Sequence, residues 1–197
     1  MRESNRDKIL DGVVRLIERD GVTAVTFDAV AAETGITRGG IIYHFSSRDE
    51  LILATHQHLA RQWEAQLLSL TPDPDLPADR YKAYVQSCSR DATRAELLMM
   101  LESAGDERLA QVWSEVMDHW APPAPQVDDP VGRANFLARI AADGLWAHRA
   151  MGGRPLSPEV KAMVTDSLLR MMESRSTPTG PSALSRTPLL RADRGEG

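Results

Sequence analysis

Apolar residues recur at α-helical spacing wherever this 197-residue chain is not interrupted by proline or glycine. In the first segment, the residues at the i, i+1, i+4, i+7 and i+8 positions of one helix face are Ile9, Leu10, Val13, Leu16 and Ile17. No segment alternates apolar and polar residues over the length of a sheet strand, since the nearest case, residues 22–27, is short and isolated. The sequence therefore predicts an all-α fold.

Capping signals indicate where the early helices begin and end. Thr26 and Thr37 can each cap a helix that follows, and Gly21 can end the first helix in a left-handed cap. Ser47 with Glu50 three residues later fits a capping box that opens a long helix to about residue 70. Further helices are expected over 78–92, 94–104, 106–120, 131–151 and 157–173.

Composition divides the chain into three parts. Proline-rich and glycine-rich breaks fall at 71–77, 121–130 and 152–158. From Ser174 the chain consists largely of Ser, Thr, Pro, Gly and Arg without a hydrophobic period, which predicts a flexible tail. We expect an N-terminal domain over 1–47, a helical body over 48–173 and the tail over 174–197.

The segment from Thr26 to Leu51 has the layout of a helix-turn-helix, with the turn at Gly35. Its second helix starts with Arg38, Gly39 and Gly40, and each glycine costs about 1 kcal/mol of helix stability relative to alanine. Missing side chains allow the backbone to approach a surface closely, and the arginine fork beside them suits guanine O6 and N7. This pattern favours a DNA-reading helix.

Local charge agrees with a narrow DNA-binding face. Residues 37–48 contain two arginines, one histidine and no acid, whereas residues 1–50 contain seven Lys and Arg against nine Asp and Glu. The tyrosine hydroxyl of Tyr43, the imidazole of His44 and the guanidinium of Arg48 suit phosphate oxygens. Because the basic face is small, we expect specific rather than indiscriminate DNA binding.

These residues resemble the DNA-binding domain of the TetR family of transcriptional regulators. The resemblance covers about the first 51 residues and matches a variant that ends Gly-Gly-x-x-Tyr-His-Phe, followed by a basic residue, an acidic pair and leucine. It implies a homodimer that reads a palindrome in double-stranded DNA, with a body that dimerises through its last two helices and holds a small-molecule pocket. The residues it implies as DNA-facing are Thr26, Thr37, Arg38, Gly39, Gly40, Tyr43, His44 and Arg48.

Two positions on this second helix have alternative interpretations. Many family members carry an aromatic residue where Ile42 stands, so only apolar contact with a thymine methyl could replace a polar contact there. Tyr43 could pack in the core instead of contacting DNA, whereas Phe45 is expected to close the core of the first three helices.

The body is rich in tryptophan and methionine. Such side chains are commonly core residues, but flexible thioethers and aromatic rings also suit a pliable apolar cavity. The candidate pocket residues are Trp63, Met99, Met100, Trp113, Met117, Trp120 and Trp146. His119, Asp143 and His148 are candidates to orient a polar end of the ligand, although each could be satisfied within the bundle.

The last two helices carry apolar faces that could pair across a two-fold axis or pack only within the monomer. The candidate dimer-interface residues are Leu137, Ala141, Leu145, Val164, Leu168 and Met171.

Other functional classes lack support in the sequence. His56 and His58 lie on different sides of their helix and cannot chelate together, and Cys88 has no identifiable base, so we expect no metal site, no cofactor and no catalytic residue. The N-terminus lacks a secretory signal and no apolar run could span a membrane, which predicts a cytoplasmic protein without a membrane partner.

The sequence thus predicts a homodimeric repressor that a small apolar or aromatic effector releases from a palindromic operator. A nucleotide effector is disfavoured because no glycine-rich phosphate loop follows a strand. Two alternatives stay open. One is an activator or ligand-independent regulator with the same DNA chemistry, and the other is an α-helical enzyme or binding protein with an incidental helix-turn-helix.

Overall fold

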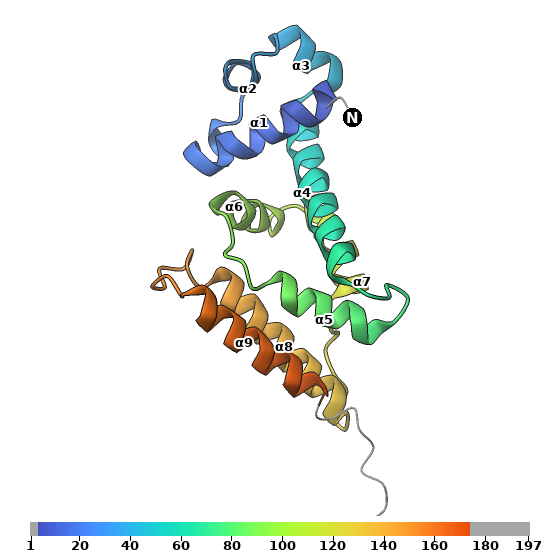
Figure 1. Ribbon diagram of the computed structural model, residues 1–197. Helices are drawn as coiled ribbons and strands as arrows, with labels where there is room; N and C mark the ends of the chain where they lie inside the picture. Colours follow the sequence, from blue (N-terminus) through green and yellow to red (C-terminus); the bar gives the residue numbers. More distant parts are fainter. Residues whose placement is uncertain (1–3, 174–197) are drawn as a thin grey trace, which may run out of the picture.

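The computed structural model describes residues 4–173, which form nine α-helices, one 3-10 turn and no strand. The all-α prediction is confirmed (Figure 1). The elements are α1 (Asn5–Asp20), η1 (Val22–Ala24), α2 (Phe27–Thr34), α3 (Arg38–His44), α4 (Arg48–Leu70), α5 (Pro77–Ser87), α6 (Arg94–Ser103), α7 (Glu107–Trp120), α8 (Pro130–Ala147) and α9 (Pro158–Glu173). The predicted tail at 174–197 lies outside the described residues.

The three predicted N-caps begin α2, α3 and α4. Thr26 Oγ1, Thr37 Oγ1 and Ser47 Oγ each accept a backbone N–H three residues later at 3.1 Å. The capping box at Ser47 differs from the prediction, because the Glu50 carboxylate accepts both the backbone N–H and the hydroxyl of Ser46, each at 2.7 Å. These local bonds fix the start of each helix.

The two glycine turns of the N-terminal domain are not alike. Gly35 adopts the left-handed conformation (φ 69°) between α2 and α3. Gly21 also has a positive φ of 88°, but its ψ of 170° is extended, so the predicted left-handed cap is wrong there. The extended ψ directs the chain into the short turn η1.

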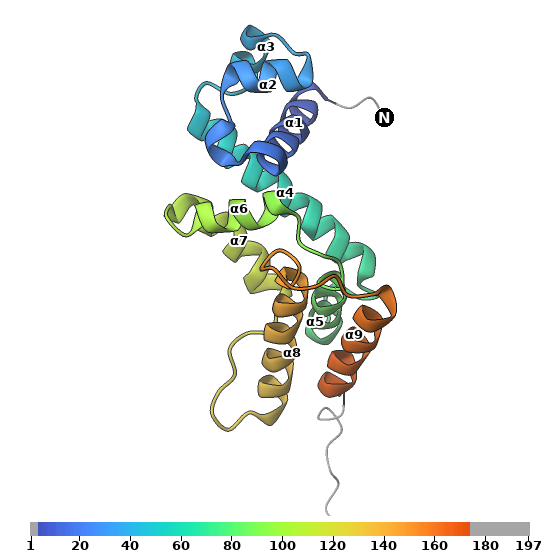
Figure 2. The same cartoon turned by 90° about the vertical axis from the view of Figure 1, so that its left-hand side faces the viewer.

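The helix α4 connects the N-terminal domain to the body (Figure 1). Helix α1 packs against α4, α2 packs on α1 and α3 at the N-terminal end of α4, and α5 and α7 contact α4 further along. The pair α8 and α9 packs on α5 at the far end of the molecule from α3 (Figure 2). A displacement of α4 would therefore move the helix-turn-helix relative to the body.

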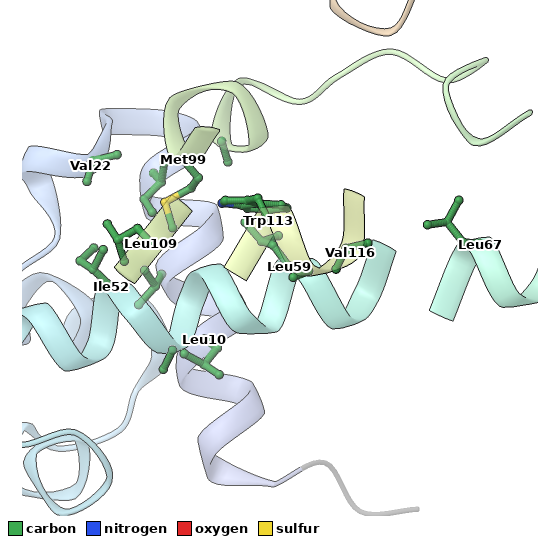
Figure 3. Close-up of a cluster of buried hydrophobic side chains, with 14 of the residues drawn as sticks. Leu10, Val22, Ile52, Leu59, Leu67, Met99, Leu109, Trp113 and Val116 are labelled. Atoms are coloured by element: carbon green, nitrogen blue, oxygen red, sulfur yellow. The ribbon is translucent and has the colours of Figure 1, made fainter. Parts of the chain in front are cut away.

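One continuous apolar core joins the two parts. Figure 3 shows Leu10 of α1 and Val22 near Ile52 of α4, Met99 of α6 and Leu109 of α7. Further along α4, Leu59 lies against Trp113 of α7. Because this core is shared, the N-terminal domain is not independent of the body.

Two predicted helices are too long at their C-terminal ends. The helix expected over 78–92 ends at Ser87, where the chain turns so that the N–H of Ala92 can donate to the carbonyl of Trp146 at 2.9 Å. The helix expected over 131–151 ends at Ala147, since Gly152 adopts a positive φ of 89° and the chain turns back there. The contact between Ala92 and Trp146 is long-range and is not visible in a local pattern.

Candidate nucleic-acid interface and internal cavity

The short helix α3 presents one face to the core and the other to solvent. Ile41 and Phe45 are fully buried, whereas the Tyr43 side chain is 86% exposed. The alternative that Tyr43 packs in the core is therefore wrong, and the expected core position of Phe45 is confirmed. An exposed phenol at the end of a helix-turn-helix is a group that the fold does not use.

Thr26 and Thr37 also lie at the surface, at the starts of α2 and α3. Their hydroxyl oxygens accept the capping N–H bonds, but each hydroxyl keeps its own proton as a donor. Capping and donation to a phosphate oxygen are thus compatible at both residues.

Arg38 points outward from the first turn of α3 and pairs with Asp28 of α2. Its Nη1 lies 3.0 and 2.9 Å from the two carboxylate oxygens, and both side chains are more than half exposed. Exposed ion pairs contribute about 0–1 kcal/mol, so the guanidinium can exchange this partner for a base edge at small cost.

The two glycines of α3 have different surroundings. A Cβ added at Gly39 would meet no described atom within 4 Å, so the fold itself does not require glycine there. A Cβ at Gly40 would approach Ile36 Cγ2 at 3.0 Å and Thr37 Oγ1 at 3.3 Å, so packing within the protein favours glycine there. Packing within the described residues thus explains the glycine at position 40 but not the glycine at position 39.

Arg48 and His44 are held more tightly than the sequence suggested. Arg48 Nε and Nη2 donate to the carbonyls of Val25 and Val22 at 3.0 and 2.9 Å, tying the start of α4 to η1. The His44 ring is half-buried and makes an edge contact with the Tyr43 ring at 5.2 Å. Arg48 therefore has a structural role beside any contact with phosphate.

A cavity of about 280 Å³ lies between α4, α5, α6, α7 and α8. Five of the seven predicted pocket residues line it: Trp63, Met100, Trp113, Met117 and Trp146. Met99 and Trp120 do not, and these two predictions are corrected. Both side chains are fully buried in the apolar core, where Met99 packs beside Leu109 (Figure 3) and the Trp120 indole N–H lies 3.4 Å from Glu64 Oε1.

Apart from Asp143, the sequence did not predict the polar part of the cavity lining. Arg90 and Glu96 form a two-bond ion pair, with Nη1–Oε2 at 2.9 Å and Nη2–Oε1 at 2.5 Å. Tyr84, Ser87 and Cys88 also line the wall, and burial raises the pKa of the Cys88 thiol to about 12. The six-residue spacing of the ion pair carries no helical signal that could have identified it.

Of the three candidates for orienting a ligand, only Asp143 lines the cavity. Its Oδ1 accepts the Tyr84 hydroxyl at 2.6 Å, and burial of the carboxyl raises its pKa above the ordinary range. His119 instead makes an edge contact with Trp120, and His148 lies 3.1 Å from the carbonyl of Arg154.

Trp113 connects the cavity to α4. Its indole N–H donates to Nδ1 of the fully buried His56 at 2.9 Å, while the same side chain lines the cavity. Burial lowers the pKa of His56 to about 4, so the ring is neutral at pH 7. A neutral ring is also what the bond requires, because Nδ1 must be free to accept.

The first turn of α6 touches both the cavity and the N-terminal domain. Glu96 lines the cavity, while Arg94 Nη1 donates to the carbonyls of Glu18 and Arg19 at 2.8 and 2.9 Å. The N–H of Ala95 donates to the Glu18 carboxylate at 2.6 Å. These contacts join the wall of the cavity to the C-terminal end of α1.

The apolar face of α8 and α9 differs in register from the predicted one. Leu137 and Ala141 are exposed as expected, and Ile140, which the prediction missed, is 52% exposed. Leu145 is buried within the monomer, a correction of one predicted position. The other three predicted residues, Val164, Leu168 and Met171, are half-buried.

Residues 4–173 contain neither a metal-binding cluster nor a membrane-spanning helix. No group of three or more His, Cys, Asp or Glu side chains there could hold a metal ion. None of the helices in this range is long and apolar enough to cross a lipid bilayer.

A helix-turn-helix with an outward-facing second helix, joined to a cavity-bearing helical body, defines a DNA-binding regulator of transcription. Residues 9–55 match the family described as bacterial regulatory proteins, tetR family, and residues 78–173 match the tetracyclin repressor-like C-terminal domain. The two matches together span most of the chain. The chain belongs to the TetR family.

Similar proteins agree with this assignment. The HTH-type transcriptional regulator BetI of Burkholderia mallei is 26% identical over 171 residues, which cover 79% of this chain and 87% of BetI. A regulator structure from Saccharomonospora viridis in complex with choline has a TM-score of 0.63 at 19% identity, covering 86% of this chain and 96% of that one. The multidrug binding protein EbrR with imidazole has a TM-score of 0.52 at 22% identity, covering 83% and 88%. These relatives point to a regulator rather than an enzyme.

Proposed function

We propose that this chain is a homodimeric repressor whose body binds a small apolar or aromatic effector and then releases a palindromic operator. The N-terminal part, 1–47, is the DNA-binding unit, and residues 48–173 bind the effector and form the dimer. Solved structures of this fold hold small organic molecules, imidazole in EbrR and choline in the Saccharomonospora viridis protein, which supports a ligand in the body.

The DNA contacts proposed for α3 follow from its exposed groups. Arg38 reads a base edge after leaving Asp28, Gly39 lets the backbone approach, and the Tyr43 hydroxyl binds a phosphate oxygen. The Gly-Gly-x-x-Tyr-His-Phe segment is the recognition helix in this proposal. Thr26, Thr37, His44 and Arg48 contribute further phosphate contacts at its edges, and Gly40 keeps the helix start compact.

The contacts of the first turn of α6 carry the proposal of ligand response. A ligand that displaces Glu96 moves this turn, and the turn holds the end of α1 through Arg94. Because α1 packs on α2, the shift reaches the helix-turn-helix. Effector and DNA then oppose each other through a reciprocal coupling free energy.

Displacement of bound DNA tests this coupling. The full chain is bound to DNA from upstream of its own gene and titrated with hydrophobic aromatic compounds while tryptophan fluorescence is followed. We expect quenching together with release of DNA. In Arg94→Ala the quenching should persist, whereas release should require roughly tenfold more compound, a typical size for such coupling.

Arg61→Ala on α4 is the matched control and should behave like the wild type, since it also removes an exposed arginine. Quenching without any release from the wild-type protein would favour a ligand-independent regulator. Transcription that rises when the protein binds its site would identify an activator. Unchanged release in Arg94→Ala would contradict the proposed route through α6.

The dimer is proposed to form through the exposed apolar face of α8 and α9. On α8 this face includes Leu137, Ile140 and Ala141, and a Cβ added at Gly144 would meet no described atom within 4 Å, so a partner helix could approach closely. Ile140→Glu should sediment as a helical monomer that no longer binds the operator. Leu101→Glu, which changes an exposed leucine on α6, should remain dimeric, and a dimeric Ile140→Glu would show that the interface lies elsewhere.

A further inference from the structure

Four aromatic side chains give the cavity walls a definite electrostatic character. These are Trp63, Tyr84, Trp113 and Trp146. The Trp63 ring centroid lies 5.8 Å from that of Tyr84 at 59° and 6.5 Å from that of Trp113 at 45°. These tilted rings lie close together in one cavity wall, and the faces of aromatic rings attract cations.

Among the described residues that line the cavity, the only cation is Arg90, and it is already engaged. Arg90 makes two bonds to Glu96, and its Nε lies 3.4 Å from the side-chain oxygen of Gln66. The Glu96 carboxylate also accepts the backbone N–H of Thr93 at 2.8 Å. The pair is therefore neutral as a unit, and an anionic ligand would have to break it to gain a counter-charge.

Of the two described acids that line the cavity, Asp143 is less closely paired with a cation than Glu96. Its Oδ1 accepts the Tyr84 hydroxyl, but its Oδ2 lies 3.9 Å from Arg139 Nε, which is beyond hydrogen-bond distance. Arg139 uses its Nη1 on the carbonyl of Pro122 instead. Burial raises the pKa of Asp143 more than Tyr84 and Arg139 lower it. A further positive charge beside the carboxylate would therefore stabilise its ionised form.

We propose that the cavity binds a small organic monocation, with the charge beside Asp143 and the apolar body against the aromatic rings. The cavity volume of about 280 Å³ is at the small end of the range for ligand sites, which favours a compact ligand. This inference rests on the proposed function only for its consequence, the release of DNA. Binding to the cavity can be measured without DNA.

A pair of isosteres tests the charge directly. Phenyltrimethylammonium and tert-butylbenzene have the same shape, and only the first carries a charge. Titration of the full chain, followed by tryptophan quenching and by the shift in melting temperature, should show the cation binding about tenfold or more tightly. Benzenesulfonate, an anion of similar size, should bind more weakly than either compound.

The variant Asp143→Asn tests whether the preference for the cation comes from this carboxylate. The amide oxygen can still accept the Tyr84 hydroxyl, so the cavity keeps its shape while it loses the charge. The preference for the cation should fall to about threefold or less, the remainder coming from the rings, with the affinity for tert-butylbenzene unchanged. Asp118→Asn, an exposed acid on α7 that does not line the cavity, should retain the full preference.

Several results would overturn this inference. They are equal binding of the two isosteres, tighter binding of benzenesulfonate, binding of none of the three compounds, or a full cation preference in Asp143→Asn. The isostere comparison uses wild-type protein, so it decides the matter even if the variant fails to fold. Loss of DNA binding or of DNA release in separate assays would refute the proposed function and leave this result intact.

Discussion

The exposed face of α3 and the cavity of the body use their polar side chains in opposite ways. On α3, Arg38 has only an exposed surface partner and Tyr43 projects into solvent. In the cavity, Arg90 is bonded to Glu96, and Tyr84 to Asp143. An exposed face can exchange its partners for DNA without leaving buried groups unsatisfied. A cavity with buried polar pairs instead favours a ligand whose charge complements the buried group that is least closely paired.

This difference also separates stability from function in the two regions. A change on the outer face of α3 should alter DNA binding with little effect on folding. A change in the cavity wall should alter folding first, because its side chains share the apolar core with α4 and α7. Each of the following predictions tests one side of that separation.

The largest effect is expected at His56, behind the cavity wall. The His56 pKa of about 4 lies below the 6.5 of an exposed histidine, so the unfolded chain binds a proton between these values and the folded chain does not. The stability from neutral His56 is complete above pH 6.5 and is lost as the pH falls toward 4. The free energy of unfolding should drop by about 3 kcal/mol through this group.

His56→Asn checks this prediction by urea unfolding at several pH values. The asparagine oxygen can accept the Trp113 N–H without titrating, so the variant should lack this part of the pH dependence. Identical pH profiles for the two proteins would mean that His56 is protonated in the fold or is not buried as described.

Arg38→Ala tests the exposed side. We expect a loss of about 1–3 kcal/mol in binding to the specific operator, because one base contact disappears. Binding to random DNA should change much less, and the melting temperature should stay within the range of a lost exposed ion pair. Fluorescence anisotropy on both duplexes measures the first two quantities. Equal losses on both duplexes would make Arg38 a phosphate contact instead.

Arg48→Ala should affect both the stability of the fold and the binding of DNA. Loss of its hydrogen bonds to the carbonyls of Val22 and Val25 should lower the free energy of unfolding by about 1–2 kcal/mol. The loss is smaller than for buried charged hydrogen bonds, because the Arg48 side chain is exposed. Thermal and urea unfolding measure this loss. An unchanged stability, with a salt dependence of DNA binding reduced by about one phosphate contact, would give Arg48 a role in DNA binding alone.

Gly39→Ala should produce the smallest change in stability and the clearest separation between stability and DNA binding. Alanine should stabilise α3 by about 0.5–1 kcal/mol, because the space around the position is open and alanine favours the helix. Operator binding should nevertheless weaken, because the added methyl separates the backbone from DNA. Gly40→Ala is the contrasting variant, since its methyl would press on Ile36. Unimpaired operator binding by Gly39→Ala would show that α3 does not approach DNA at this position.

The local parts of the structure could be predicted from the sequence. The starts of α2, α3 and α4 follow from Thr26, Thr37 and Ser47, because an N-cap bond spans only three residues. The outward position of Tyr43 beside buried Phe45 follows from the same short helix. Such features depend on neighbours along the chain, which the sequence shows directly.

The exact lining of the cavity and its long-range hydrogen bonds could not be predicted. The bond from Tyr84 to Asp143 joins residues 59 positions apart, and no spacing rule relates them. Met99 and Trp120 have the same chemistry as the true lining residues but face the core, and Leu145 turns inward on α8. Choosing between these positions requires the packing of five helices.

The central claim is that the exposed face of α3 reads a DNA sequence. Fluorescence anisotropy of the full wild-type chain, on a duplex from upstream of its own gene and on a scrambled duplex of the same composition, tests it most directly. At physiological salt the first duplex should bind about a thousandfold or more tightly, as specific sites do. Equal affinity for the two duplexes would contradict the claim.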